Sequence, residues 1–93
     1  MILDTRPEHE VMPGTVHFAV LTTLAEVAAS TVTGASVVPT QIGVSLMRRA
    51  SPGRLIGKGK LLKKGRTLAF CEGEVFQDDR LVAKVNVQFA VVG

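Results

Sequence analysis

Residues 17–32 read HFAVLTTLAEVAASTV, and apolar side chains in this run occur at nearly every angle around a helix. Such a pattern is typical of a helix buried on most sides, for which Thr15 is the expected N-cap. Residues 16–38 are long enough to cross a bilayer, but Glu26 at their centre would cost several kcal/mol there. We therefore expect a buried helix followed by a strand, and no membrane span.

After Pro39 the hydrophobic period changes to the two-residue alternation of strands. Strands are expected over residues 2–6, 41–46, 55–62, 68–76 and 81–91. Short turns join the last four, which predicts an antiparallel meander. Because a single apolar helix needs a cover, we expect one α+β domain over residues 1–93. In it, a curved antiparallel sheet of about five strands wraps around one long helix.

The composition is that of a small globular domain, with 93 residues, 46% hydrophobic and 20% charged. It excludes a disordered tail, a collagen-like rod and a disulfide scaffold. A chain this short buries a modest share of its surface, so we expect at least a homodimer. The one cysteine, Cys71, is expected to fill space in a strand, and no secretory signal opens the chain. Both features favour a cytoplasmic location.

Basic residues are concentrated in one part of the chain. Eight of the 11 Lys and Arg residues lie between Arg48 and Arg66, where no Asp or Glu occurs. This block is either a solvated sheet face with its turns or a patch for a polyanion, such as cofactor phosphates. Nucleic acid is disfavoured as a partner, because four scattered Phe are the only aromatic residues for stacking. One Cys and two His at unsuitable spacing predict no metal site.

Glu26 is the clearest candidate for chemistry, because a carboxylate in an apolar helix needs a reason. The alternative is a carboxylate satisfied by a neighbouring group or exposed on a thin polar stripe. His17 lies nine residues earlier, two and a half turns away and therefore on roughly the opposite side of the helix. A symmetric dimer would bring Glu26 of one subunit to the helix start of the other.

The turn at residues 13–19 is the second candidate. A helix start carries unpaired N–H groups and the positive end of the helix dipole, which polarise a carbonyl and hold an oxyanion. The alternative is an ordinary capped helix in which His17 is a satisfied buried histidine.

Several motifs together resemble one known family. They are Gly14-Thr15-Val16-His17, Leu24-Ala25-Glu26, Arg48-Arg49-Ala50-Ser51-Pro52-Gly53, Gly65-Arg66 and Leu81-Val82-Ala83. In this combination the chain is similar to the hotdog-fold thioesterases, and most closely to their PaaI-like acyl-CoA thioesterase branch. The spacing from His17 to Glu26 is the most specific element of the resemblance.

The resemblance implies a hotdog fold that forms homodimers, often paired into tetramers, and hydrolyses acyl-CoA. Glu26 would activate water or attack the thioester, the backbone N–H of Phe18 or Ala19 would polarise its carbonyl, and His17 would brace the loop. The resemblance also implies a set of substrate-binding residues, some of which would contact the phosphates of coenzyme A. They are Gly14, Arg48, Arg49, Lys63, Lys64 and Arg66. Coenzyme A would enter as part of the substrate, and no further cofactor is implied.

Two differences from the family motif favour an alternative. The family's His-Gly-Gly is His17-Phe18-Ala19 here, and residues 10–13 lack the amide side chain that often precedes the turn. The alternative is a non-catalytic hotdog module that binds acyl-CoA or acyl-carrier thioesters.

Overall fold

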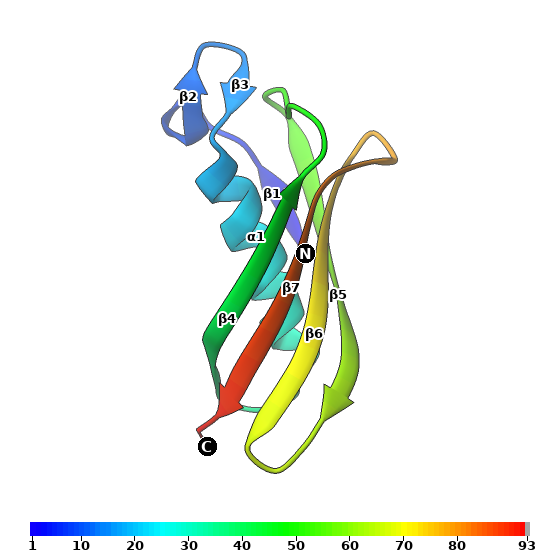
Figure 1. Cartoon of the computed structure of the whole chain (residues 1–93). Helices are drawn as coiled ribbons and strands as arrows, with labels where there is room; N and C mark the ends of the chain where they lie inside the picture. Colours follow the sequence, from blue (N-terminus) through cyan, green and yellow to red (C-terminus); the bar gives the residue numbers. More distant parts are fainter. Residues whose placement is uncertain (93) are drawn as a thin grey trace.

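The computed structural model describes residues 1–92 as one helix packed on one face of a five-stranded antiparallel sheet (Figure 1). The sheet strands are β1 (Ile2–Asp4), β4 (Val37–Leu46), β5 (Arg54–Lys64), β6 (Leu68–Gln77) and β7 (Arg80–Val91), and the helix is α1 (Phe18–Thr31). A 3-10 turn, η1 (Pro7–His9), and a small hairpin of β2 (Glu10–Met12) and β3 (Thr15–Val16) precede the helix. The α+β hotdog architecture predicted from the sequence is therefore confirmed.

The strand order is β1-β5-β6-β7-β4, so the predicted meander is right only for β5, β6 and β7. β4 pairs with β7, although β5 follows it directly in the chain. The short link between β4 and β5 does not force these strands to be neighbours. They are three strand spacings apart in the sheet, which is only about 14 Å. Residues 47–53 are seven residues long and span up to roughly 23 Å when extended, which is enough to cross β7 and β6.

The helix starts later than predicted and is buried on one face only. Its N-cap is His17, not Thr15, which lies in β3. Its buried residues are Leu21, Leu24, Ala25, Ala28 and Ala29. The prediction of burial on most sides was wrong, because the sheet covers a single side and leaves the other face open. α1 has 14 residues, and no helix in the described part of the chain is long and apolar enough to cross a membrane.

Two glycines allow the helix to approach the sheet very closely. A Cβ added at Gly59 would overlap the carbonyl oxygen of Ala28, and one added at Gly73 would overlap that of Ala25. Both strands therefore present bare backbone to the helix, and the small helix residues complete the contact. This approach sets the depth and the rotation of α1 on the sheet.

The core lies between α1 and the concave face of the sheet. Its largest fully buried side chains are Phe89, Leu55, Val75, Val85 and Cys71. The two-residue alternation expected for residues 68–76 is confirmed, because Ala69, Cys71, Gly73 and Val75 are buried on one face of β6. Burial raises the pKa of the Cys71 thiol, which keeps it protonated and inert as a strand filler.

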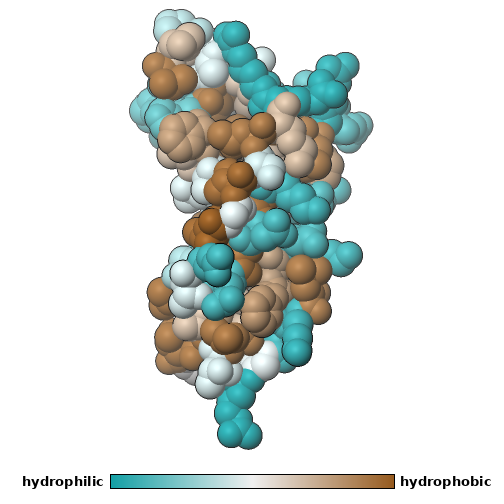
Figure 2. Space-filling model, in the orientation of Figure 1, coloured by the Kyte–Doolittle hydropathy of each residue, from teal (hydrophilic) through white to brown (hydrophobic). Residues whose placement is uncertain are grey.

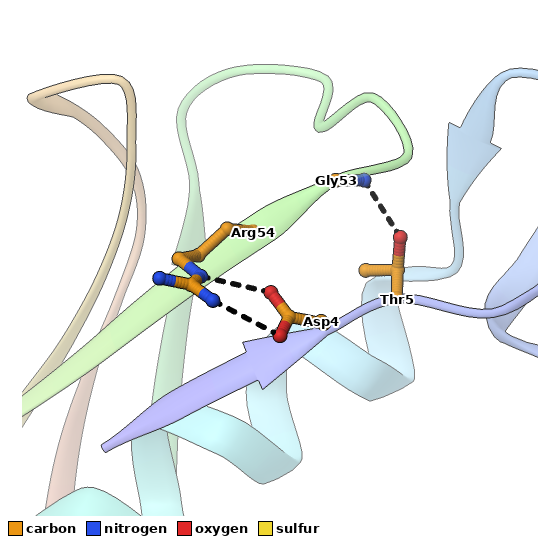
Figure 3. Close-up of polar contacts among 4 residues, drawn as sticks. All are labelled: Asp4, Thr5, Gly53 and Arg54. Carbon is orange, nitrogen blue, oxygen red and sulfur yellow. Dashed lines mark hydrogen bonds and ion pairs between the residues drawn. The ribbon is translucent and has the colours of Figure 1, made fainter.

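The short edge strand β1 is anchored to the start of β5 by polar contacts (Figure 3). Arg54 Nε donates to Asp4 Oδ1 at 2.9 Å, and Gly53 N–H donates to Thr5 Oγ1 at 2.7 Å. The Arg54 guanidinium lowers the pKa of the Asp4 carboxyl through this hydrogen bond. These contacts hold the first residues of the chain against the edge of β5.

Replacing Gly73 by Ala tests the close approach. We expect Gly73→Ala to destabilise the fold by about 3 kcal/mol in chemical denaturation, because backbone rather than a flexible side chain must move. Gly43→Ala is the matched control, since a Cβ there has no atom within 4 Å. The control should leave the stability unchanged or raise it by less than about 1 kcal/mol. Equal stability of the two variants would contradict the proposed role of Gly73.

Candidate functional site

The start of α1 is held between the N-terminal hairpin and the loop after β4. His17 N–H donates to the carbonyl of His9 at 2.8 Å, and Val16 N–H donates to the carbonyl of Ala50 at 2.9 Å. The first bond joins the N-cap of the helix to the end of η1, and the second joins β3 to the loop after β4. They fix the direction in which the first turn of the helix points.

Of the two amides predicted to polarise a carbonyl, only one is free. Ala19 N–H donates to Nδ1 of His17 at 3.0 Å, so the cap satisfies it. Val20 N–H donates to the carbonyl of His17 at 3.0 Å. Phe18 N–H has no acceptor within residues 1–92 and cannot have one inside the helix. The Phe18 amide is therefore the donor that this helix start offers to a ligand.

Glu26 lies on the open face of α1, where it is half-buried. This position agrees with the alternative considered in the sequence analysis, a carboxylate on a thin polar stripe of the helix. Thr22 and Thr23 precede Glu26 by one turn and Ser30 follows it by one turn, so all four lie on nearby angles of the helix. No side chain of residues 1–92 bonds or pairs with the carboxylate. Glu26 is about 12 Å along the helix axis from Phe18, too far for both to act on one atom from one chain.

Two hollows flank the first turn of the helix. The first, about 400 Å³, lies between the hairpin and the end of β4 and is lined by Val11, Thr15, Val16, Phe18, Leu21, Leu46, Met47, Arg48, Arg49 and Ala50. The second, about 500 Å³, lies between the open helix face and β4 and is lined by Phe18, Ala19, Thr22, Thr23, Val44 and Leu46. Phe18 and Leu46 line both, so these two side chains form a shared wall.

Three arginines gather at the same end of the sheet. Arg48 and Arg49, in the loop after β4, meet Arg80 at the start of β7 around a polar hollow of about 650 Å³. Asp78 also lines this hollow and offsets part of the positive charge. Sequence analysis missed Arg80, because it lies outside the basic block and only the strand pairing brings it near. No local signal in the sequence could have found it.

The loop that carries Arg48 and Arg49 is fixed by hydrogen bonds. Met47 N–H and Arg48 N–H both donate to the carbonyl of Val82, at 2.9 and 3.2 Å. Gln77 Nε2 donates to the carbonyl of Ser51 at 2.7 Å, and Ser51 N–H donates to Gln77 Oε1 at 3.0 Å. The arginine backbone is thus held against the β6–β7 turn.

The family model of the Thioesterase superfamily matches residues 13–84. The chain belongs to the thioesterase superfamily. The match covers the helix start, Glu26 and the arginine loop, and it confirms the resemblance found in the motifs. No curated protein gives a significant match to the sequence.

Solved structures agree with this family. A phenylacetic acid degradation-related protein from Ralstonia eutropha is 30% identical, with a TM-score of 0.76 over 95% of this chain and 67% of its own. A mutant of the phenylacetic acid degradation protein PaaI from Thermus thermophilus is 22% identical, with a TM-score of 0.88 over 98% and 82%. The protein BH2602 from Bacillus halodurans, solved with CoA, is 21% identical, with a TM-score of 0.88 over 99% and 66%. The chain is thus a hotdog thioesterase-superfamily protein of PaaI-like type.

The remaining predicted phosphate contacts lie at the other end of the molecule. Lys63, Lys64 and Arg66 belong to the β5–β6 hairpin, at the opposite end of β5 from the arginine hollow (Figure 1). The length of β5 separates the two clusters by roughly 33 Å. Lys64 Nζ donates to the carbonyl of Thr33 at 2.8 Å, so it also ties the segment after α1 to the sheet. The structure divides the predicted basic patch into two clusters.

Two further residues complete the description of this end of the fold. Gly14, predicted to contact substrate, is at the tip of the β2–β3 hairpin with a φ of 85°, and its N–H donates to Glu10 Oε1 at 2.9 Å. It is not among the residues that line the three hollows. His9, which sequence analysis passed over, lines an apolar groove of about 440 Å³ between β1 and α1 together with Ala19 and Thr23.

Proposed function

We propose that this protein is an acyl-CoA thioesterase that works as a homodimer with its site between two subunits. One observation carries the proposal: the first hollow at the helix start, which Phe18 lines, adjoins the arginine hollow, because Arg48 and Arg49 line both. A thioester at the helix start would have its anionic end beside guanidinium groups, which bind phosphates well. The CoA in the related structure from Bacillus halodurans supports this class of ligand.

The exposed edge of the sheet supports a dimer. β4 is the last strand in the sheet order, and its helix-facing residues Ile42, Val44 and Leu46 are 40%, 44% and 51% exposed. Figure 2 shows hydrophobic surface along the side of the molecule that β4 occupies in Figure 1. A long strand with one unpaired edge and an apolar face favours pairing with a second copy. The two-fold axis of such a dimer makes the two helices antiparallel.

A dimer of this kind supplies Glu26 to the helix start of its partner. Within one chain Glu26 lies about 12 Å along the helix axis from Phe18, and among residues 1–92 no side chain bonds to its carboxylate. A two-fold axis near Thr22, midway between Phe18 and Glu26, places Glu26 of one helix beside the start of the other. Glu26 of one subunit, His17 as the brace of the turn and the Phe18 amide of the other subunit then form one site.

The chemistry needs only a base and an oxyanion donor. Glu26 takes a proton from water while the water oxygen bonds to the thioester carbon, or its carboxylate attacks that carbon directly and water hydrolyses the resulting anhydride. The Phe18 N–H and the helix dipole stabilise the oxyanion. With water as the nucleophile, the C–S bond breaks as the tetrahedral intermediate collapses, and the CoA thiolate receives the proton that Glu26 took. With Glu26 as the nucleophile, the C–S bond breaks as the anhydride forms, and the thiolate receives a proton from the water that then hydrolyses the anhydride.

The alternative, a non-catalytic module for thioester ligands, is favoured by one observation. Phe18 places a side chain at the helix start where the family motif has glycine, and Val11 lines the first hollow in place of an amide. Binding of acyl-CoA without turnover would decide for this alternative.

Replacing Glu26 by Gln removes the base while keeping the shape of the side chain. We expect kcat for acyl-CoA hydrolysis, measured by thiol release, to fall by at least about 100-fold, with binding retained. Glu74→Gln, on the outer face of β6 at the same degree of burial, is the control and should keep its activity. Equal turnover of Glu26→Gln and the parent protein would refute the catalytic role.

A carboxylate on the apolar, helix-facing side of β4 tests the dimer. We expect Val44→Glu to be monomeric in analytical ultracentrifugation and to lose turnover, because each subunit would bring an unpaired carboxylate into the apolar surface that the dimer buries. Ile56→Glu replaces a similarly exposed residue on the outer face of β5 and should remain an active dimer. An active parent protein that sediments as a monomer would contradict the shared site.

Two double variants test the split of the basic residues. We expect Arg48→Gln with Arg80→Gln to raise KM about tenfold, equivalent to about 1.4 kcal/mol, with kcat nearly unchanged. The effect should weaken as salt screens the charges. Lys63→Gln with Arg66→Gln removes the same charge at the far end. If its KM rises equally, the far cluster contacts the substrate of the partner subunit.

A further inference from the structure

Phe18 presents a large apolar side chain to solvent at the first position of the helix. Its side chain is 58% exposed, and it lines both hollows at the helix start. We propose that Phe18 is a specificity-determining residue that confines the acyl group to the second hollow and so selects short acyl chains. This inference rests on the proposed function, and it concerns a residue that departs from the glycine of the family motif.

The ring of Phe18 is held in one direction by its neighbour. It stacks on the imidazole of His17 with ring centroids 4.5 Å apart and a tilt of 32°. His17 is itself fixed, because its Nδ1 accepts Ala19 N–H and its N–H donates to the carbonyl of His9. The wall between the hollows therefore has a defined position relative to the Phe18 amide.

The two hollows differ in what surrounds them. The first opens toward Arg48 and Arg49, which suits the CoA part of the ligand. The second runs along the open helix face that carries Thr22 and Thr23, one turn before Glu26, and suits the acyl part. A carbonyl on the Phe18 N–H lies directly beside the Phe18 side chain. A long acyl chain that fills the second hollow cannot fold back into the first while the ring stands between them.

Removal of the Phe18 ring would leave only Leu46 between the two hollows and would give a long acyl chain more apolar space. We expect Phe18→Ala to raise the ratio of kcat/KM for decanoyl-CoA to that for butyryl-CoA at least tenfold, while the backbone N–H stays in place. Phe70→Ala is the matched control, since Phe70 is an exposed Phe, 38% accessible, on the outer face of β6. An unchanged ratio in Phe18→Ala, or an equal change in both variants, would overturn the inference.

Binding measurements separate this inference from the proposed function. Calorimetry with non-hydrolysable decanoyl and butyryl thioether analogues of CoA gives an affinity ratio that needs no turnover. If the parent protein hydrolyses thioesters and Phe18→Ala leaves both ratios unchanged, the specificity role fails and the function stands. If it binds the analogues without hydrolysis and Phe18→Ala shifts the affinity ratio tenfold toward decanoyl, the function fails and the specificity role stands. If the parent protein binds neither analogue, both the proposed function and the specificity role fail. Thermal unfolding of the parent protein and of each variant verifies that they are folded.

Discussion

The contact between the helix backbone and two glycines of the sheet determines the rest of this structure. Gly59 and Gly73 leave room for the carbonyls of Ala28 and Ala25, so α1 lies deeper on the sheet than any side chain would allow. A helix held by its backbone cannot roll, because rotation would bring larger residues against the strands. Glu26 is therefore fixed on the open face, and the helix start is fixed at the end of β4.

The elements that were predicted correctly are those with a local signal. The alternation of β6 and β7 follows from side-chain period alone, and the structure confirms it. The apolar run likewise predicted a helix correctly, although only one face of α1 is buried. The errors arose where distant pairing decides. Thr15 is part of the hairpin strand β3, where it pairs with Met12 of β2, and the helix cap is His17 instead. The order of β4 and β5 likewise depends on pairing with β7 and β6, which no local pattern shows.

The candidate site divides in the same way. The spacing from His17 to Glu26 is a property of one helix, and the structure places both residues on that helix or at its cap. Arg80 joins Arg48 through the strand pairing, whereas Lys63 and Arg66 move away from them because β5 carries the chain to the far end of the sheet. A cluster in sequence became two clusters in space, since an extended strand separates its ends by about 3.3 Å per residue.

The backbone and the side chain of Phe18 have separable roles in the proposed site. The N–H that would hold the oxyanion belongs to every residue except proline, so a substitution at this position leaves the electrostatics of the helix start intact. The side chain, in contrast, is free to vary in size because it projects from the fold rather than into its core. Glycine there opens the space beside the carbonyl, and phenylalanine closes it. A single position at the helix start is thus able to change which acyl groups are accepted without changing how the carbonyl is polarised.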